Sequence, residues 1–225
     1  MEQAFPTMST DAKTFVVGVS GASGAAYALR LLHLLISGGH EVHLVVSDYG
    51  RRLLFEEADV RALDAPSLLP ELAGADADPD LALGATRRLF IHPNRDVGAV
   101  IASGSFLHDG MVVLPCSSTS LGAIASGAGS NLLTRAAMVT LKERRRLIVC
   151  HRETPLSLID IENMRTLTLA GAIVCPTNPG FYLLPRTVGE IVDFMVGKVL
   201  DLLSVEHGLK TRWGERESEA ERALD

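Results

Sequence analysis

The stretch VVGVSGASGAAYALRLLHLL, from Val16 to Leu35, predicts the first unit of the fold. Its β-branched start indicates a buried strand, and the leucines at its end recur at helical spacing. The turn between them, Ser20 to Gly24, contains only small residues. The stretch therefore indicates a strand, a tight turn and a helix in direct succession.

The same alternation of apolar runs and helical segments continues along the chain. We expect helices between the strands, the last from about Val188 to Ser204, and an irregular or partly helical segment between Asp59 and Arg88. Continuously apolar strands separated by helices predict an α/β fold with a parallel sheet covered on both faces. The expected strands are TFVVGV (Thr14 to Val19), EVHLVV (Glu41 to Val46), VGAVIASGS (Val97 to Ser105), GMVVLPCSS (Gly110 to Ser118), RLIVC (146–150) and GAIVC (171–175).

Charge and composition exclude several classes of protein. The 225 residues carry 21 Lys and Arg against 27 Asp and Glu, a net charge of −6, which argues against a nucleic-acid-binding surface. The first residues lack a signal peptide, and no apolar run approaches the roughly 18 residues of a membrane span, so we expect a cytoplasmic protein without a membrane partner. The seven histidines show no metal-ligand spacing, and no metal is predicted. Cys116, Cys150 and Cys175 each end a predicted strand and are expected to be structural thiols.

Small and hydroxyl-bearing residues follow the predicted strands. They occur at Ser20 to Gly24, Ser47-Asp48, Ser103 to Ser105 and Cys116 to Ser120. Each loop alone is explained by helix capping, but four on one rim of a parallel sheet favour a phosphate site. The first turn lacks the second and third glycines of G-x-G-x-x-G and the Gly-Lys-Ser/Thr of a P-loop, which disfavours NAD and ATP and leaves an FMN phosphate compatible.

Basic and aromatic residues in the later half form two further signals. The first comprises Arg135 and the run Lys142 to Arg146, of which Arg144 to Arg146 are explained equally well as a solvated helix face. Arg152 and Glu153 directly follow an apolar strand, so we expect them on the rim, where a cation holds phosphate and a carboxylate exchanges protons. The loop PTNPGFYLLP from Pro176 to Pro185 suits either packing or a planar, apolar ligand.

Together these segments resemble the flavin prenyltransferase (UbiX-like) family from Val16 to Glu215. The similar motifs are the SGASG turn, EVHLVVS, ASGS, PCSSTSLGAIASG, NLLTRAAMVTLKERR, HRETPLSLIDIENM, PGFYLLP, VDFMVGKVLD and RWGE. The resemblance implies a Rossmann-like (flavodoxin-like) three-layer sandwich that forms trimers and commonly a dodecamer. It also implies transfer of a dimethylallyl group from dimethylallyl monophosphate to N5 and C6 of reduced FMN, without a metal. The prenylated FMN would be the cofactor of UbiD-type decarboxylases.

The resemblance also implies roles for particular residues. The expected catalytic residues are Ser23, Glu57, Lys142 and Glu153. The expected FMN-binding residues are Gly21, Ala22, Ser23, Ser47, Ser117, Ser118, Thr119, Ser120 and Arg152. The expected substrate-binding residues are Ser103, Arg135, Lys142, Tyr182, Lys198 and Trp213. We expect a disordered extension over 1–13, one flavoprotein domain over 14–209, and a tail over 210–225 that partly closes the active site.

Two departures from the family pattern and two other functions remain open. Ser117 to Ser120 stand where many relatives have Ser-Thr-Gly-Thr, and Lys198 replaces an arginine. One alternative is an accessory flavin-carrier subunit of an aromatic-acid decarboxylase. The other is a flavin-dependent cysteine decarboxylase, although the Pro-x-Met-Asn signature of that group is missing.

Overall fold

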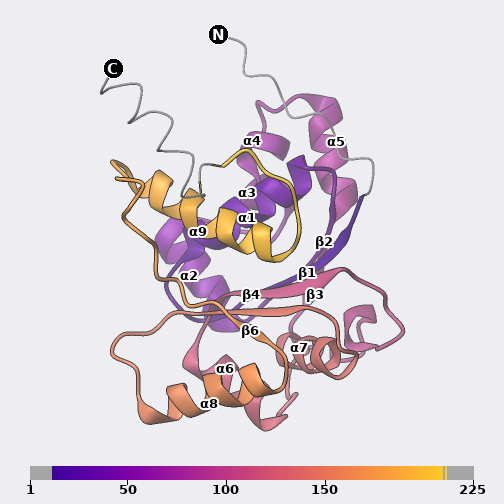
Figure 1. The fold of residues 1–225 in the computed structure, drawn as a ribbon. Coiled ribbons are helices and arrows are strands. Elements are labelled where there is room, and N and C mark those ends of the chain that lie inside the picture. The colour runs from indigo at the N-terminus through magenta and orange to yellow at the C-terminus, as the bar shows by residue number, and fades with distance from the viewer. Residues whose placement is uncertain (1–11, 210, 212–225) are drawn as a thin grey trace.

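One sheet of six parallel strands, in the order β3-β2-β1-β4-β5-β6, organises the molecule (Figure 1). The computed structural model describes residues 12–209 and 211. The strands are β1 (Thr14–Val19), β2 (Glu41–Val46), β3 (Leu89–Pro93), β4 (Gly110–Cys116), β5 (Leu147–His151) and β6 (Ile173–Val174). The helices are α1 (Ala25–Ser37), α2 (Asp48–Ala58), α3 (Ala65–Leu68), α4 (Pro70–Ala73), α5 (Pro79–Arg88), α6 (Ser118–Ser126), α7 (Leu132–Lys142), α8 (Leu158–Leu169) and α9 (Val188–Leu202), with a 3₁₀ turn η1 (Val100–Ala102).

The order of the strands creates a switch point beside β1. The chain builds β1, β2 and β3 outward in one direction and then returns to place β4 on the other side of β1. This is the order of a Rossmann sheet, in which ligands bind beyond the carboxyl ends of the strands where the direction reverses. The segments after β1 and β4, Ser20 to Gly24 and Ser117 onward, meet at that point.

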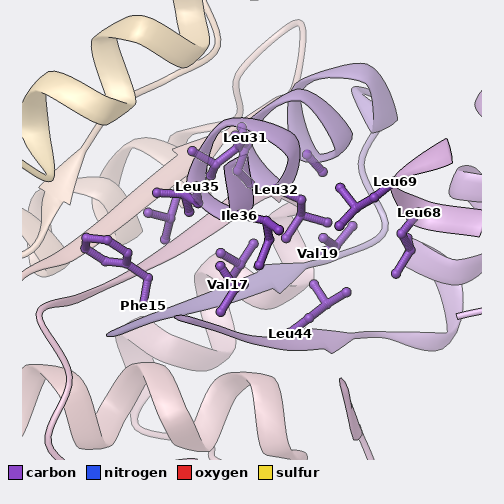
Figure 2. Close-up of a cluster of buried hydrophobic side chains, with 14 of the residues drawn as sticks. Phe15, Val17, Val19, Leu31, Leu32, Leu35, Ile36, Leu44, Leu68 and Leu69 are labelled. Atoms are coloured by element: carbon purple, nitrogen blue, oxygen red, sulfur yellow. The ribbon is translucent and has the colours of Figure 1, made fainter. Parts of the chain in front are cut away.

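Helices cover both faces of the sheet, as the apolar strands predict. The helices α1 and α9 pack against each other on one face, while α6, α7 and α8 cover the other (Figure 1). On the first face, Leu31, Leu35 and Ile36 of α1 are buried on Phe15 and Val17 of β1 (Figure 2). On the second face, α6 and α7 pack on β4 and β5 in a separate apolar cluster. The predicted three-layer sandwich is confirmed.

Most predicted elements agree with the structure, but one strand is wrong and another was missed. Thr14–Val19 and Glu41–Val46 are strands with those bounds. The predicted strand over Val97–Ser105 is instead a loop with a single 3₁₀ turn, because Val97 and Val100 are about half exposed and only Ile101 and Ala102 are buried. The missing strand is β3, an edge strand that pairs only with β2 and leaves Phe90 41% exposed. Because it is short, half exposed and ends in a proline, it lacks the long apolar run that marks the central strands.

The segment between Asp59 and Arg88 contains three short helices, α3 to α5, and so is partly helical as expected. Lys13, at the end of the predicted extension, donates from Nζ to the carbonyl of Ser204 over 2.6 Å. The predicted tail over 210–225 lies outside the described residues except for Thr211. No helix in the described part of the chain has the length and apolar character needed to cross a membrane.

Candidate functional site

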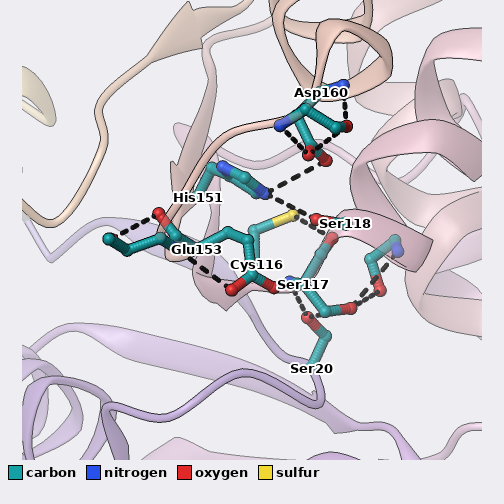
Figure 3. A network of polar contacts seen from close by, with 10 residues as sticks. Ser20, Cys116, Ser117, Ser118, His151, Glu153 and Asp160 are labelled. Atoms are coloured by element: carbon teal, nitrogen blue, oxygen red, sulfur yellow. Dashed lines mark hydrogen bonds and ion pairs between the residues drawn. The ribbon is translucent and has the colours of Figure 1, made fainter.

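Serine side chains link the loops that follow β1 and β4 at the switch point. The Ser20 hydroxyl donates to the carbonyl of Pro115 over 3.0 Å and accepts the backbone N–H of Ser117 over 2.8 Å. Ser20 is buried, and Figure 3 shows it beneath the Ser117 turn. These bonds hold the two loops together, so the rim of the sheet is prearranged at this place.

Two helix N-termini open onto the same rim. The Ser47 hydroxyl accepts the N–H of Gly50 at the start of α2, and the Ser117 hydroxyl accepts the N–H of Ser120 at the start of α6. The carboxyl ends of the strands therefore present N–H groups and hydroxyls together. Such termini carry partial positive charge and favour anionic groups. Thr119 is exposed in the first turn of α6, so its side chain does not disturb the helix where relatives have glycine.

The N-terminus of α1 already holds an anion, the carboxylate of Glu57. One oxygen of Glu57 accepts the N–H groups of Gly24 and Ala25, each over 2.9 Å. Partial burial opposes ionisation, but the bonds from Ala25, Gly24 and the Ser23 hydroxyl, with the nearby Arg152 guanidinium, lower the pKa of Glu57. At neutral pH Glu57 is therefore a carboxylate, able to accept a proton but with none to donate.

A polar cavity of about 350 Å³ lies beside this carboxylate. Its walls include Ser23, Tyr27, Arg152 and Glu153, which come from the first turn, α1 and the loop after β5. Arg152 is anchored by its backbone N–H on the carbonyl of Cys116, over 3.1 Å. Three residues that the sequence predicts for the site, Ser23, Arg152 and Glu153, thus meet in one hollow.

A buried polar network lies on the side of the Ser117 turn opposite Ser20 (Figure 3). His151 Nε2 lies 3.1 Å from the Ser118 hydroxyl and 3.8 Å from a carboxylate oxygen of Asp160. Hydrogen bonds from Ser118 and Ser157 lower the pKa of Asp160 to about 2. Both partners of His151 face the same ring nitrogen, whereas a Ser-His-Asp triad uses one nitrogen for each. The network therefore positions the Ser118 turn and the loop that carries Arg152.

A second, larger cavity of about 540 Å³ adjoins the first. The two share Asn178, and the larger one combines apolar Phe194 and Met195 with polar Tyr182 and Lys198. The Tyr182 hydroxyl donates to the carbonyl of Thr211 over 3.1 Å, and its ring packs edge-on against Phe194. The cavity joins a cation to an apolar wall, which suits a small ligand with an anionic head and a hydrocarbon tail.

Comparison with known proteins identifies the family. A family model described as Flavoprotein matches residues 4–200. The chain is 44% identical over 201 residues to a flavin prenyltransferase UbiX of Halalkalibacterium halodurans, covering 89% of this chain and 93% of that protein. It is 39% identical to a flavin prenyltransferase UbiX of Pseudomonas aeruginosa, covering 89% and 93%. The chain belongs to the flavin prenyltransferase family.

Solved structures of the family share its architecture. AnUbiX, solved in complex with FMN and dimethylallyl pyrophosphate, has a TM-score of 0.75 and 35% identity over 90% of this chain and 98% of its own. A dodecameric FMN-dependent UbiX-like protein from Escherichia coli has a TM-score of 0.73 and 38% identity over 89% and 98%. The cysteine decarboxylase TvaF has a TM-score of 0.51 at 17% identity, covering 72% of this chain and 89% of its own, a likeness of fold alone.

Lys142 and Ser103, two predicted site residues, lie at the amino ends of the strands, opposite the rim that carries Arg152. The Lys142 ammonium, at the end of α7, pairs with Glu143 and lies beside Gly104. Just beyond it, the Arg146 carbonyl accepts the N–H of Met111 at the start of β4. The five residues of β5, about 16 Å of strand, therefore separate the Lys142 region from Arg152.

Arg135 lines neither of the described cavities. Arg135 is exposed near the start of α7, whose first N–H groups bind Asn94 just after β3. Trp213 lies outside the described residues. Within the described chain, no group of three or more His, Cys, Asp or Glu side chains is placed to hold a metal ion.

Several residues that line the cavities were missed by the sequence analysis. Tyr27 lies within a helix that showed only apolar spacing, and Thr177 and Asn178 belong to a loop noted for its prolines and aromatics. Cys175 was expected to be a structural thiol, yet it lines the larger cavity. Its position at the carboxyl end of a predicted parallel strand, where ligands bind, was the one available signal.

Proposed function

We propose that this chain transfers a dimethylallyl group from dimethylallyl monophosphate to N5 and C6 of reduced FMN. The product, prenylated FMN, would serve a UbiD-type decarboxylase as its cofactor. One observation carries the proposal: a cavity with a cation and an apolar wall adjoins a hydroxyl-rich rim at the switch point of the sheet. AnUbiX, which was solved with FMN and dimethylallyl pyrophosphate, supports the pairing of a flavin with a prenyl donor.

The donor groups of the rim fit FMN. The starts of α2 and α6 offer N–H groups and the hydroxyls of Ser47 and Ser117 to Ser120 for a phosphate. The start of α1 is taken by Glu57, which directs a second anion away from it. Gly21, Ala22, Ser23 and Arg152 would then border the ring system. When bound in reduced form, FMN supplies the two nucleophilic positions that receive the prenyl unit.

Lys198 and Tyr182 would hold the phosphate of the donor. Breaking the bond between the allylic carbon and the phosphate oxygen leaves negative charge on the phosphate and positive charge on the hydrocarbon. A preorganised cation stabilises the first, and the apolar wall of Phe194 and Met195 keeps water from the second. Tyr182 would contribute by turning its single hydroxyl proton from the Thr211 carbonyl to the phosphate. A monophosphate matches one cation better than a diphosphate does, and a side-by-side assay of the two donors decides between them.

We assign acceptance of the C6 proton to Glu153. Both Glu57 and Glu153 lie near Ser23 and Arg152, but one Glu57 oxygen is engaged by two backbone N–H groups and its pKa is lowered, which makes it a weaker base. Glu153 accepts one backbone bond, from Thr154 over 3.0 Å, and is exposed in the cavity. Glu57 would position Ser23 and Arg152.

Lys142 and Ser103 would reach the site from a second copy of the chain. Within one chain the length of β5 separates their region from Arg152, so a shared role requires a partner. The dodecameric Escherichia coli relative supports a homo-oligomer. Arg135 is exposed and is available to the same interface.

Rescue of an inactive UbiD-type decarboxylase distinguishes prenylation from flavin carriage. The purified protein, reduced FMN and dimethylallyl monophosphate are incubated without oxygen, and the filtrate is added to the cofactor-free decarboxylase. The proposal expects activity from this mixture and none when the donor is omitted. Equal rescue without the donor would instead establish a flavin carrier.

A further inference from the structure

Cys175 and Cys150 lie side by side at the carboxyl ends of β6 and β5. The register pairs Val149 with Val174, and the N–H of Cys175 donates to the carbonyl of Val149 over 2.9 Å. The two cysteines are thus the next pair along neighbouring strands, close enough for each thiol to shift the pKa of the other. Neighbouring strands are about 4.8 Å apart, within the range of Cα separations that a disulfide spans.

The two thiols have different access to solvent. Cys150 is fully buried, whereas Cys175 is partly exposed and lines the 540 Å³ cavity with Lys198 and Asn178. Cys116, the third cysteine, is also fully buried. A reagent that enters the cavity therefore meets Cys175 first.

The surroundings of Cys175 favour its thiolate. The hydrogen bond from Cys150 and the Lys198 ammonium outweigh the opposing effect of burial and lower the pKa of Cys175 to about 7. The same bond raises the pKa of Cys150, and burial raises the pKa of Cys116. A thiol whose pKa lies near the ambient pH is the best nucleophile for thiol–disulfide exchange.

We propose that Cys175 is a thiol–disulfide exchange site for small disulfides that enter the Lys198 cavity, with Cys150 as the resolving thiol. The Cys175 thiolate attacks one sulfur of the small disulfide, whose S–S bond breaks and releases one thiolate. Cys150 then attacks the Cys175 sulfur, breaking the mixed disulfide, and its proton passes to the departing sulfur, which leaves the cavity as a thiol. The cysteine pair loses two electrons, and the small disulfide gains them.

The cavity selects the class of disulfide. Two charged side chains line the cavity, the Lys198 ammonium and the Asp201 carboxylate, and Asp201 lies 3.4 Å from His207 Nε2. Lys198 favours a carboxylate or other anionic group, and Phe194 with Tyr182 favours a flat or apolar body. The site thus takes small anionic disulfides. The inference does not depend on the identity of the prenyl donor, so its failure would leave the proposed function untouched.

Reaction of the native protein with dithiobis(nitrobenzoate), an aromatic disulfide with carboxylates, tests the proposal. The wild type should release two nitrothiophenolates per chain without retaining an adduct, and peptide mapping should find Cys150 linked to Cys175. Cys150→Ser should release one and keep the mixed disulfide on Cys175. Cys175→Ser should release none on the same timescale, while Cys116→Ser, the matched control, should behave as the wild type.

The pH and anion dependence tie the reaction to the cavity. The rate for the wild type should rise with a midpoint near pH 7, and inorganic phosphate should slow it severalfold by occupying Lys198. Unchanged release from a folded Cys175→Ser variant, or a stable adduct on the wild type with no link between Cys150 and Cys175, would overturn the proposal. Circular dichroism and melting of each variant confirm that the native fold is being measured.

Discussion

Removal of the Glu57 carboxylate tests whether it caps α1. Its two hydrogen bonds, each 2.9 Å, satisfy Gly24 and Ala25, and no side chain of the N-cap residue itself does so. Loss of such a cap costs about 1 kcal/mol, with a range of about 0.5–2. The interaction of the charge with the helix dipole adds about 0.3–1 kcal/mol.

Glu57→Ala should therefore lose about 1–2 kcal/mol of unfolding free energy, a fall in melting temperature of about 2–8 °C for a chain of this size. Glu57→Gln keeps an acceptor oxygen and should lose only about 0.3–1 kcal/mol, the part that depends on charge. Glu56→Ala is the matched control, because Glu56 forms only a solvent-exposed pair with Arg52, and such pairs contribute little to stability.

Differential scanning calorimetry at one fixed protein concentration measures all three variants, since oligomers melt in a concentration-dependent way. The folded-state pKa of Glu57 is lowered, so its charge stabilises the fold above its unfolded pKa of about 4.3 and the benefit disappears as pH falls through the folded value. The gap between the wild type and Glu57→Gln should narrow in acid. If Glu57→Ala melts no lower than Glu56→Ala, the carboxylate does not cap the helix.

Three further predictions concern the rim, the donor cavity and the assembly. The pKa of Asp160 is lowered to about 2, so its stabilising effect should be complete above about pH 4 and lost between about pH 4 and pH 2; Asp160→Asn should remove this dependence in acid titrations followed by circular dichroism. Lys198→Met should raise the KM for the prenyl donor about tenfold without changing the Kd for FMN, since it removes one exposed charged contact; an unchanged KM would exclude Lys198 from the phosphate site. Inactive Lys142→Ala and Arg152→Ala chains, assembled together in equal amounts, should recover about a quarter of wild-type activity, because that share of two-chain sites is intact; no recovery from correctly assembled mixtures would place each site within one chain.

The sequence predicts the architecture because its strands are buried on both faces. Runs such as Thr14–Val19 and Glu41–Val46 indicate central strands, and the hydroxyls after them lie on one rim as expected. The predicted fourth loop of that rim, Ser103 to Ser105, is wrong, because it precedes β4 and lies at the amino ends of the strands. The edge strand β3 escapes because it is short and half exposed. The apolar run Val97–Ala102 was wrongly predicted as a strand, because a loop that buries only Ile101 and Ala102 can have the same composition.

The candidate site is only partly predictable because its contacts join distant segments. The bond between Glu57 and the start of α1 spans more than thirty residues, and no periodicity signals it. The separation of Lys142 from Arg152 follows from topology, since a helix that connects two parallel strands returns the chain to the amino ends of the strands. Similarity to the family motifs assigned both cations to the site, but it did not indicate that Arg152 lies at the carboxyl ends of the strands and Lys142 at their amino ends.

The mass of the flavin after turnover tests the central claim most directly. Reduced FMN and dimethylallyl monophosphate are incubated with the protein without oxygen, with Arg152→Ala as the matched control, and the released flavin is analysed by mass spectrometry. A flavin heavier by one five-carbon prenyl unit with the wild type, and unmodified FMN with the variant, is the predicted result. Unmodified FMN from the folded, FMN-loaded wild type, with either the mono- or the diphosphate donor, would contradict it.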